Sequence, residues 1–404
     1  MDNDTDYQEL LQRRYFYSYL SSSIFIVLCA LIGITGNFAI IFFYFFRIKE
    51  RGERYFIPLL AIVDLVACFT SPPFYIIDNT FFFNYPSDTA CRILSFLQTC
   101  VPGASAHILL VISIQRYLLV CKPFGPKMTL IWKRVFFGVV CGLSVAYSAP
   151  LLWTAGVLES IEIFMDHNVT IKICKFSVDS SPTITVYFGF LTLIMLANLF
   201  ITAGLYVPVL KRVRRSFLER SRKTEAYREE IMESSCATQT TEAENGSVDS
   251  TNNVKDSKVI QLNERKLNIP TNNCQETVRK SSSNISENGA ETNVSYPGST
   301  SNKKSRTKLG SVQRRVTWMF FVIIVAYVFS YIPPLVILIL VYTIEDFNFI
   351  TLSEAQTLAW LYFARFVFLN QIINPFIYGY FDTKFRNKLR ICCRRRNTKT
   401  FNIM

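Results

Sequence analysis

The sequence is poor in the residues from which most enzyme sites are built. It contains only two histidines among 404 residues, and no spacing of histidine and cysteine fits a zinc site. It has no nucleophile paired with a general base, no glycine-rich phosphate loop and no pair of catalytic carboxylates. We therefore expect neither an enzyme nor an organic cofactor.

Charged residues are also scarce, at 18% of the chain, and 50% of the residues are hydrophobic. The apolar residues gather in blocks of about 20, the length that a helix needs to cross a bilayer. The predicted spans are 19–46, 56–81, 91–120, 132–153, 183–210, 316–342 and 353–378. The chain starts without the pattern of a signal peptide, so we expect the first span to act as its own anchor.

The distribution of charge indicates how these spans are oriented. The net charge is +13, and the basic residues follow the first, third, fifth and last spans, whereas the opposite segments are acidic. The positive-inside rule then places the N-terminus outside the cell and the C-terminus in the cytoplasm, which requires an odd number of spans. We expect a multi-pass protein of the plasma membrane and no nucleic-acid partner.

The spans divide the chain into five parts. Residues 1–18 are an extracellular polar arm, 19–210 hold the first five spans, and 316–380 hold the last two. The intervening segment 211–315 is rich in polar residues and poor in aromatics, which predicts a disordered cytoplasmic loop that is helical only at its basic ends. Residues 381–404 predict a basic amphipathic helix and tail at the membrane face. The expected fold class is an all-α seven-transmembrane bundle followed by this short helix.

Helical rise places several polar side chains at one depth in the bilayer. Counted from the start of the third span, Ser105 lies about 21 Å inward and Arg116 about 37 Å inward. Asn37, Asp64, Asn370 and Asn374 reach a depth similar to that of Ser105. An aspartate inside a bilayer is costly, and these oxygen atoms suit a small cation. The pattern is consistent with a sodium site or with hydrogen bonds that join the helices.

Three further residues each allow two interpretations. Arg116, at the cytoplasmic end of span three, either controls a cytoplasmic partner or is an arginine that extends to the membrane edge. Pro333 gives span six either a pivot or a static bend. Arg365, in the outer part of span seven, meets either an acidic group of a ligand or a neighbouring carboxylate.

In their order and spacing, these landmarks resemble the rhodopsin-like (class A) G protein-coupled receptors over all seven spans. The matching residues are Gly36-Asn37, Leu60-Ala61-Ile62-Val63-Asp64, Cys91, Gln115-Arg116-Tyr117, Cys174, Tyr206, Pro333, Asn370 and Asn374-Pro375-Phe376-Ile377-Tyr378. The resemblance implies a receptor that binds an extracellular ligand and activates heterotrimeric G proteins. It also implies arrestin and receptor kinases as partners.

The resemblance assigns roles to individual residues. It implies a disulfide between Cys91 and Cys174, and a sodium site formed by Asp64, Ser105, Asn370 and Asn374. It also implies a switch for the G protein formed by Arg116, Tyr206 and Tyr378, and palmitoylation at Cys392 and Cys393. The sequons at Asn3 and Asn168 predict glycosylation on the extracellular side. The chain departs from the family pattern where Gln115 replaces an acid, Asn198 a proline and Tyr331 a tryptophan. The missing acid predicts raised ligand-independent activity.

The expected ligand follows from the outer half of the bundle. Phe368 stands where a retinal-binding receptor needs a lysine, and Gln98 where an amine receptor has an aspartate. A glutamine at the position of Gln98 is frequent in receptors that resemble the neuropeptide group. The expected ligand site consists of Gln98 together with Tyr75, Tyr331, Trp360 and Arg365. The acidic outer loops favour a cationic peptide. The alternatives are a lipid or other small molecule, and a seven-span transporter, for which no inverted repeat is evident.

Overall fold

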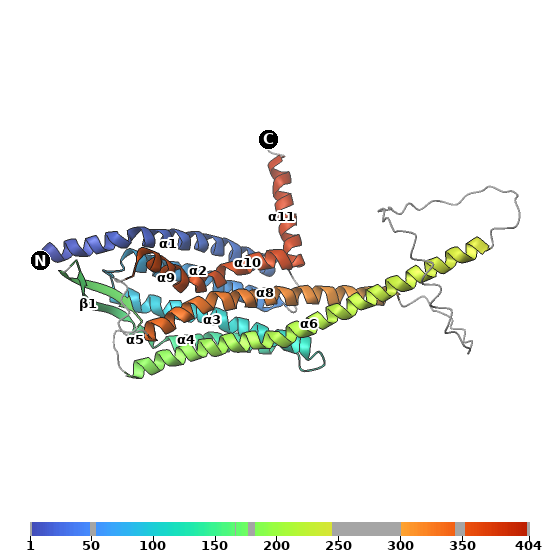
Figure 1. Cartoon of the computed structure of the whole chain (residues 1–404), viewed down its shortest axis with the longest axis horizontal. Coiled ribbons are helices and arrows are strands. Elements are labelled where there is room, and N and C mark those ends of the chain that lie inside the picture. The colour runs from blue at the N-terminus through green and yellow to red at the C-terminus, as the bar shows by residue number, and fades with distance from the viewer. Residues whose placement is uncertain are drawn as a thin grey trace. The chain divides into compact units, whose positions relative to one another are not determined.

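The computed structural model describes residues 2–48, 54–165, 167–176, 182–244, 300–343 and 352–401. The chain divides into two compact units, one of Met1–Val213 with Thr307–Met404 and one of Arg214–Arg306. In the first unit, long helices lie side by side (Figure 1). In the second, the described residues belong to the last part of α6 and the first turns of α8. Most of the predicted disordered loop, 245–299, lies outside the described residues.

The described chain is almost entirely helical. Its elements are α1 (Asp2–Phe42), the π-helical η1 (Phe43–Arg47), α2 (Phe56–Thr80), α3 (Asp88–Cys121), α4 (Leu130–Ser148), α5 (Leu151–Thr154), β1 (Gly156–Phe164), β2 (His167–Lys175), α6 (Pro182–Glu244), α8 (Thr300–Thr343), α9 (Glu354–Ala364), the 3₁₀-helical η5 (Phe366–Phe368), α10 (Leu369–Phe381) and α11 (Thr383–Phe401). The predicted fold class, with a helix after the last span, is confirmed.

Six helices of the described residues are long and apolar enough to cross a membrane, and they correspond to the first six predicted spans. The seventh predicted span is helical but interrupted. α9 ends at Ala364, the backbone turns through η5, and α10 begins at Leu369. Either helix alone is shorter than the roughly 20 residues that a span needs, so the crossing depends on both.

The first helix begins much earlier than its apolar residues indicate. α1 starts at Asp2 and includes most of the polar arm. Its first turns pack on the β1–β2 hairpin, where Leu11 and Tyr15 join Phe83 and Val169 in a buried apolar cluster. This helix is stabilised by tertiary packing, which the polar composition of residues 1–18 did not predict.

The hairpin lies at the end of the bundle where α3 begins, here called the hairpin end; the other end, which carries α11, is called the α11 end (Figure 1). β1 and β2 pair antiparallel from Gly156 with Lys175 to Phe164 with His167. Met165, in the turn, has a φ of 51°, as short hairpin loops require. The loop before α3 extends this sheet, because Lys172 exchanges backbone hydrogen bonds of 2.9 Å with Phe83 and Tyr85.

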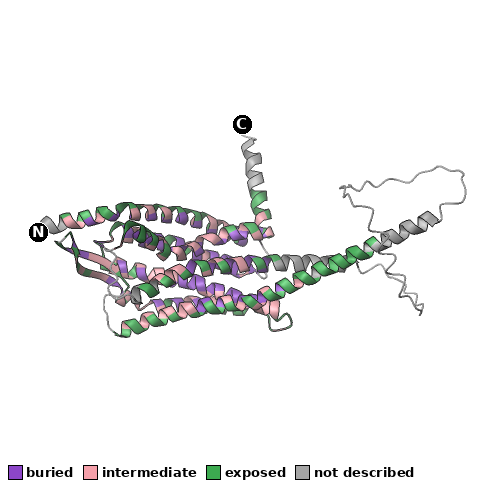
Figure 2. Ribbon diagram, in the orientation of Figure 1, coloured by how far each residue is buried: buried purple, intermediate pink, exposed green. Residues whose placement is uncertain are grey.

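Buried and exposed residues alternate along the spanning helices (Figure 2). The largest buried cluster joins α1, α2, α3, α6, α8 and α10, while large apolar side chains such as Leu28, Leu143 and Phe200 are exposed. Such an exposed apolar surface fits a bilayer, in which lipid tails replace water. α1 and α10 approach closely at Gly36, where an added Cβ would lie 2.7 Å from Pro375.

Candidate functional site

The centre of the bundle contains a buried polar cluster around Asp64. Ser105 of α3 donates to one carboxylate oxygen of Asp64 at 2.7 Å, and the amide of Asn374 donates to the other at 2.7 Å. Asn370 donates to the Ser105 hydroxyl at 3.4 Å. All four side chains are at most 1% exposed. The structure therefore brings together the four residues of the predicted sodium site.

Two oxygen atoms of this cluster lack a hydrogen-bond donor. The amide oxygens of Asn370 and Asn374 are buried and have no partner in the described part of the chain. Buried polar atoms normally find partners, and free oxygens next to a carboxylate suit a small hard cation. Asp64 contributes the one carboxylate among the four residues of this cluster. The residues thus fit a monovalent cation, and the sodium site remains a prediction.

Asn37 lies close in depth but serves a different contact. Its amide donates to the backbone oxygens of Gly33, at 3.0 Å, and Gln371, at 2.8 Å. It therefore joins α1 to α10, which is the interhelical role that the sequence left open.

Arg116 lies near the α11 end of α3 and is fully buried. Its guanidinium lies 4.4 Å from the centre of the Phe320 ring, which comes from α8. This geometry is a cation–π contact in a desolvated place. The Phe320 ring therefore covers one face of the guanidinium.

The two tyrosines predicted to act with Arg116 are buried near it. Tyr206 is 3% exposed and Tyr378 is 0% exposed. Neither hydroxyl has a hydrogen-bond partner among the residues that the structure describes. The three predicted switch residues are therefore all buried, and neither tyrosine hydroxyl is hydrogen-bonded to Arg116 in this conformation.

A second polar cluster surrounds Arg365 toward the hairpin end. Its guanidinium contacts the carboxylate of Asp78 at 3.5 Å, the side chain of Asn79, and the Leu361 backbone oxygen at 2.9 Å. Sequence reasoning left a neighbouring carboxylate as one alternative for Arg365, and the structure identifies it as Asp78. Arg365 directly follows the last residue of α9, so its contacts also fix the position of that end of the helix.

The other residues of the predicted ligand site do not all contact one another. The Tyr75 ring lies 5.2 Å from the Arg365 guanidinium, and its hydroxyl is hydrogen-bonded to Gln98. Tyr331 instead donates to the Pro102 backbone oxygen at 2.9 Å, and Trp360 is half-buried on α9. Tyr75, Gln98 and Arg365 thus form one connected group, whereas Tyr331 joins α8 to α3.

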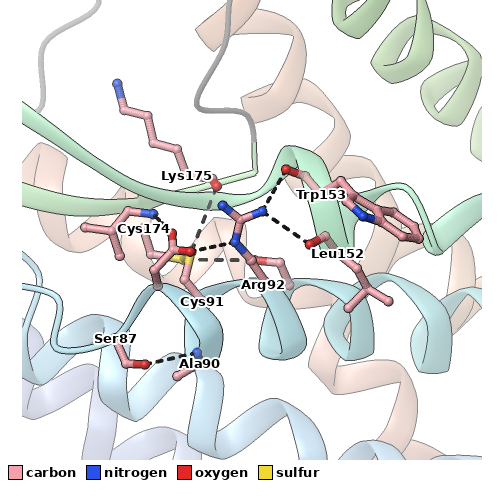
Figure 3. Close-up of polar contacts among 11 residues, drawn as sticks. Ser87, Ala90, Cys91, Arg92, Leu152, Trp153, Cys174 and Lys175 are labelled. Carbon is pink, nitrogen blue, oxygen red and sulfur yellow. Dashed lines mark hydrogen bonds and ion pairs between the residues drawn. A yellow bond between two sulfur atoms is a disulfide. The ribbon is translucent and has the colours of Figure 1, made fainter.

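A disulfide joins α3 to the hairpin, and polar contacts surround it (Figure 3). Cys91 and Cys174 are bonded, with their Cα atoms 5.7 Å apart. Arg92 donates to Asp88 at 2.6 Å and to the Trp153 backbone oxygen at 2.8 Å. The first turn of α3 is therefore held to the segment that leads into β1.

A third buried cluster, at the α11 end, was not predicted. Asp382 is 1% exposed and accepts hydrogen bonds from the Tyr44 hydroxyl, from Arg54 at 2.7 Å and from the Lys384 backbone N–H at 2.8 Å. These residues come from η1, the loop before α2, and the start of α11. Their sequence separations of 328 and 338 residues left no pattern that could reveal the cluster.

The predicted modification sites are described only in part. Asn168 is exposed on β2 and Cys392 is exposed on α11. The side chains of Asn3 and Cys393 lie outside those described. Glycosylation and palmitoylation therefore remain predictions.

Comparison with known proteins agrees with this geometry. The model of the family 7 transmembrane receptor (rhodopsin family) matches residues 36–378. The chain is 30% identical over 165 residues to cephalotocin receptor 1 of Octopus vulgaris, which covers 40% of this chain and 39% of that receptor. It is 25% identical over 142 residues to neuropeptide Y receptor type 6 of Mus musculus, which covers 35% of each.

The fold is similar to that of squid rhodopsin, with a TM-score of 0.58 and 16% identity over 92% of this chain and 84% of that one. The matches to the two curated receptors above span well under half of their length. The family model, in contrast, covers most of the chain, from the first span to the end of the seventh. The chain therefore belongs to the rhodopsin family of seven-transmembrane receptors and is a multi-pass membrane protein.

Proposed function

We propose that this protein is a plasma-membrane receptor that binds an extracellular peptide at the hairpin end and activates a heterotrimeric G protein at the α11 end. The burial of Arg116 beneath Phe320 carries the proposal. A charged group held under a movable helix is the form that a conformational switch takes. In this arrangement the N-terminus is extracellular and the C-terminus is cytoplasmic, as the basic residues at the α11 end favour.

A peptide ligand is supported by the names of the relatives and by a group of polar side chains at the hairpin end of the bundle. The names of the two receptors above refer to cephalotocin and neuropeptide Y. Tyr75, Gln98 and Arg365 offer an aromatic face together with uncharged and charged hydrogen-bonding groups. Light sensing through a retinal Schiff base is disfavoured because Phe368, a buried phenyl group, cannot form one. A lipid or other small molecule is the competing ligand class.

The Arg116→Leu variant tests the G protein step. Purified receptor in nanodiscs should catalyse nucleotide exchange on Gα when an activating peptide from a cationic library is added. Arg116→Leu should lower that exchange by about tenfold to hundredfold, since hydrogen bonds to charged groups contribute about 1.5–3 kcal/mol. Arg134→Leu, an exposed arginine near the same end, should leave the exchange unchanged.

Two outcomes would contradict this proposal. Equal exchange by Arg116→Leu and the unaltered receptor would exclude the assigned role of Arg116. Solute flux through the protein in vesicles without any G protein would favour a transporter and contradict the receptor. We also expect arrestin and receptor kinases to act at the α11 end, and no enzymatic activity in the chain itself.

We further propose that the Asp64 cluster binds sodium. Asp64, Ser105, Asn370 and Asn374 would hold the ion, which would supply a compensating positive charge in the bundle. A ligand that binds only the folded state stabilises it by mass action, by about 1.4 kcal/mol at tenfold its dissociation constant. The thermal unfolding midpoint should therefore rise when sodium chloride replaces potassium chloride.

Asp64→Asn should remove this dependence, because the neutral amide retains the size of the side chain but not its charge. Asp88→Asn, which changes a carboxylate at the hairpin end, should retain the full effect of sodium. If the Asp64 variant still responds to sodium like the unaltered protein, the cluster has only the interhelical role.

A further inference from the structure

Arg116 lies beneath a side chain of α8. Phe320 lies over the guanidinium, and Arg116 has no exposed surface. Two turns further along α8, seven residues or about 10 Å away, lies Tyr327, which is also fully buried. The next buried tyrosine, Tyr331, lies close to Pro333 and Pro334. These prolines remove backbone N–H donors and mark the natural pivot of the helix.

A hydrogen bond to the adjacent helix α6 restrains α8 at a point between this pivot and Phe320. The Tyr327 hydroxyl donates to the side-chain oxygen of Asn198, on α6, at 2.7 Å. Asn198 is 3% exposed, and Thr202 donates to the same oxygen at 3.5 Å. Both partners of the bond are therefore buried between α6 and α8.

Apolar packing between α6 and α8 is incomplete just beside this bond. A groove of about 230 Å³, open on one side, lies between the two helices. Its lining includes Ala203, Tyr206 and Leu210 of α6 and Phe321, Val325 and Phe329 of α8. A gap of this kind removes van der Waals contacts, and in a bilayer the hydrophobic effect does not drive helices together. The hydrogen bond thus adds a directional contact between α6 and α8 next to a place where their apolar packing is interrupted.

The sequence next to Arg116 offers no charged restraint of its own. The preceding residue is Gln115, which is neutral, and its side-chain oxygen is buried without a hydrogen-bond partner among the described residues. The contact between Tyr331 and Pro102 acts close to the pivot, so it limits the swing of the Phe320 end only weakly. A restraint between the pivot and Phe320 is more effective, and Tyr327 provides it.

We infer that the Tyr327–Asn198 hydrogen bond is a latch that holds α8 over Arg116 and thereby sets the ligand-independent activity of this receptor. The expected effect on signalling rests on the proposed function. The hydrogen bond and its restraint on α8 do not depend on that function. Breaking the bond shifts the equilibrium toward conformations in which Phe320 has left Arg116.

The first test is ligand-free nucleotide exchange on Gα by purified receptor in nanodiscs. Tyr327→Phe removes only the hydroxyl, and it should raise basal exchange about 3- to 15-fold, the range expected from the strengths of interhelical hydrogen bonds in membranes. Asn198→Ala should act in the same direction. The double variant should exceed neither single variant by much, because both remove one interaction.

The control is a half-buried tyrosine hydroxyl on α6 that makes an interhelical hydrogen bond of similar length. Tyr187 donates to the Tyr147 backbone oxygen at 2.8 Å and so contacts α4 rather than α8. Tyr187→Phe should leave basal exchange unchanged. Equal rises in both tyrosine variants, or additive effects in the double variant, would overturn the latch.

The second test needs no G protein. Amide hydrogen exchange of the α8 segment from Val316 to Tyr327 should accelerate by a similar factor in Tyr327→Phe and Asn198→Ala, but not in Tyr187→Phe. If α8 loosens in these variants while Gα never responds, the latch stands and the proposed function fails. If Gα responds to ligand while neither readout changes in the latch variants, the receptor stands and the latch is wrong.

Discussion

Replacing Asp382 with alanine should lower the free energy of unfolding by about 3–5 kcal/mol, the usual cost of removing one partner of a buried ion pair. The carboxylate is buried and receives the Tyr44 hydroxyl and the Arg54 guanidinium. The side chain of Arg54 is only 8% exposed, so the variant leaves a positive charge without compensation. It also removes the side chain that caps the first turn of α11, through the Lys384 and Phe385 backbone N–H groups.

Thermal and denaturant unfolding of the purified receptor measure this effect. The control is Glu9→Ala, which breaks the pair between Glu9 and Arg13. Those side chains are 65% and 77% exposed, and exposed pairs contribute about 0–1 kcal/mol. An Asp382 variant no less stable than the Glu9 variant would show that water or lipid headgroups solvate Arg54 when its partner is gone.

Removing the disulfide should have an effect of similar size. Cys91 and Cys174 close a loop with a separation of 83 residues, for which the loop-entropy relation gives about 4.5 kcal/mol. That value is an upper bound here, because the spans already restrict the unfolded chain within the bilayer. Cys91→Ser with Cys174→Ser should therefore lower the unfolding midpoint, and a reducing agent should do the same to the unaltered protein.

The control for this prediction is Cys141→Ser, a half-buried free cysteine of α4. It should change the midpoint little and should remain sensitive to the reducing agent. The double serine variant should no longer respond to reduction. A midpoint that is unchanged without the disulfide would mean that the contacts of Arg92 and the β2 pairing hold the hairpin by themselves.

The spanning helices follow from composition because lipid allows few alternatives. A chain in the bilayer core must satisfy its backbone hydrogen bonds internally, so an apolar run of sufficient length becomes a helix. Depth along a helix then follows from its rise, which is why Asp64, Ser105 and Asn374 could be grouped before their contacts were known. The disulfide between Cys91 and Cys174, in contrast, followed from the resemblance to the receptor family.

Other features depend on contacts that composition does not encode. Residues 2–18 are polar, yet they form part of α1 because Leu11 and Tyr15 pack on the hairpin. The break in span seven occurs where Arg365 binds Asp78 and the Leu361 backbone oxygen. Each outcome depends on a partner far away in the sequence.

The sequence by itself determined which segments cross the membrane, how deep their polar residues lie and which family they resemble, since these depend on hydropathy, helical rise and motif spacing. Only the tertiary structure decided which polar side chains meet, as with Tyr327 and Asn198 or Arg54 and Asp382. The physical reason is that a contact between helices depends on how each is rotated and tilted. Hydropathy along one helix contains almost no information about the rotation of another.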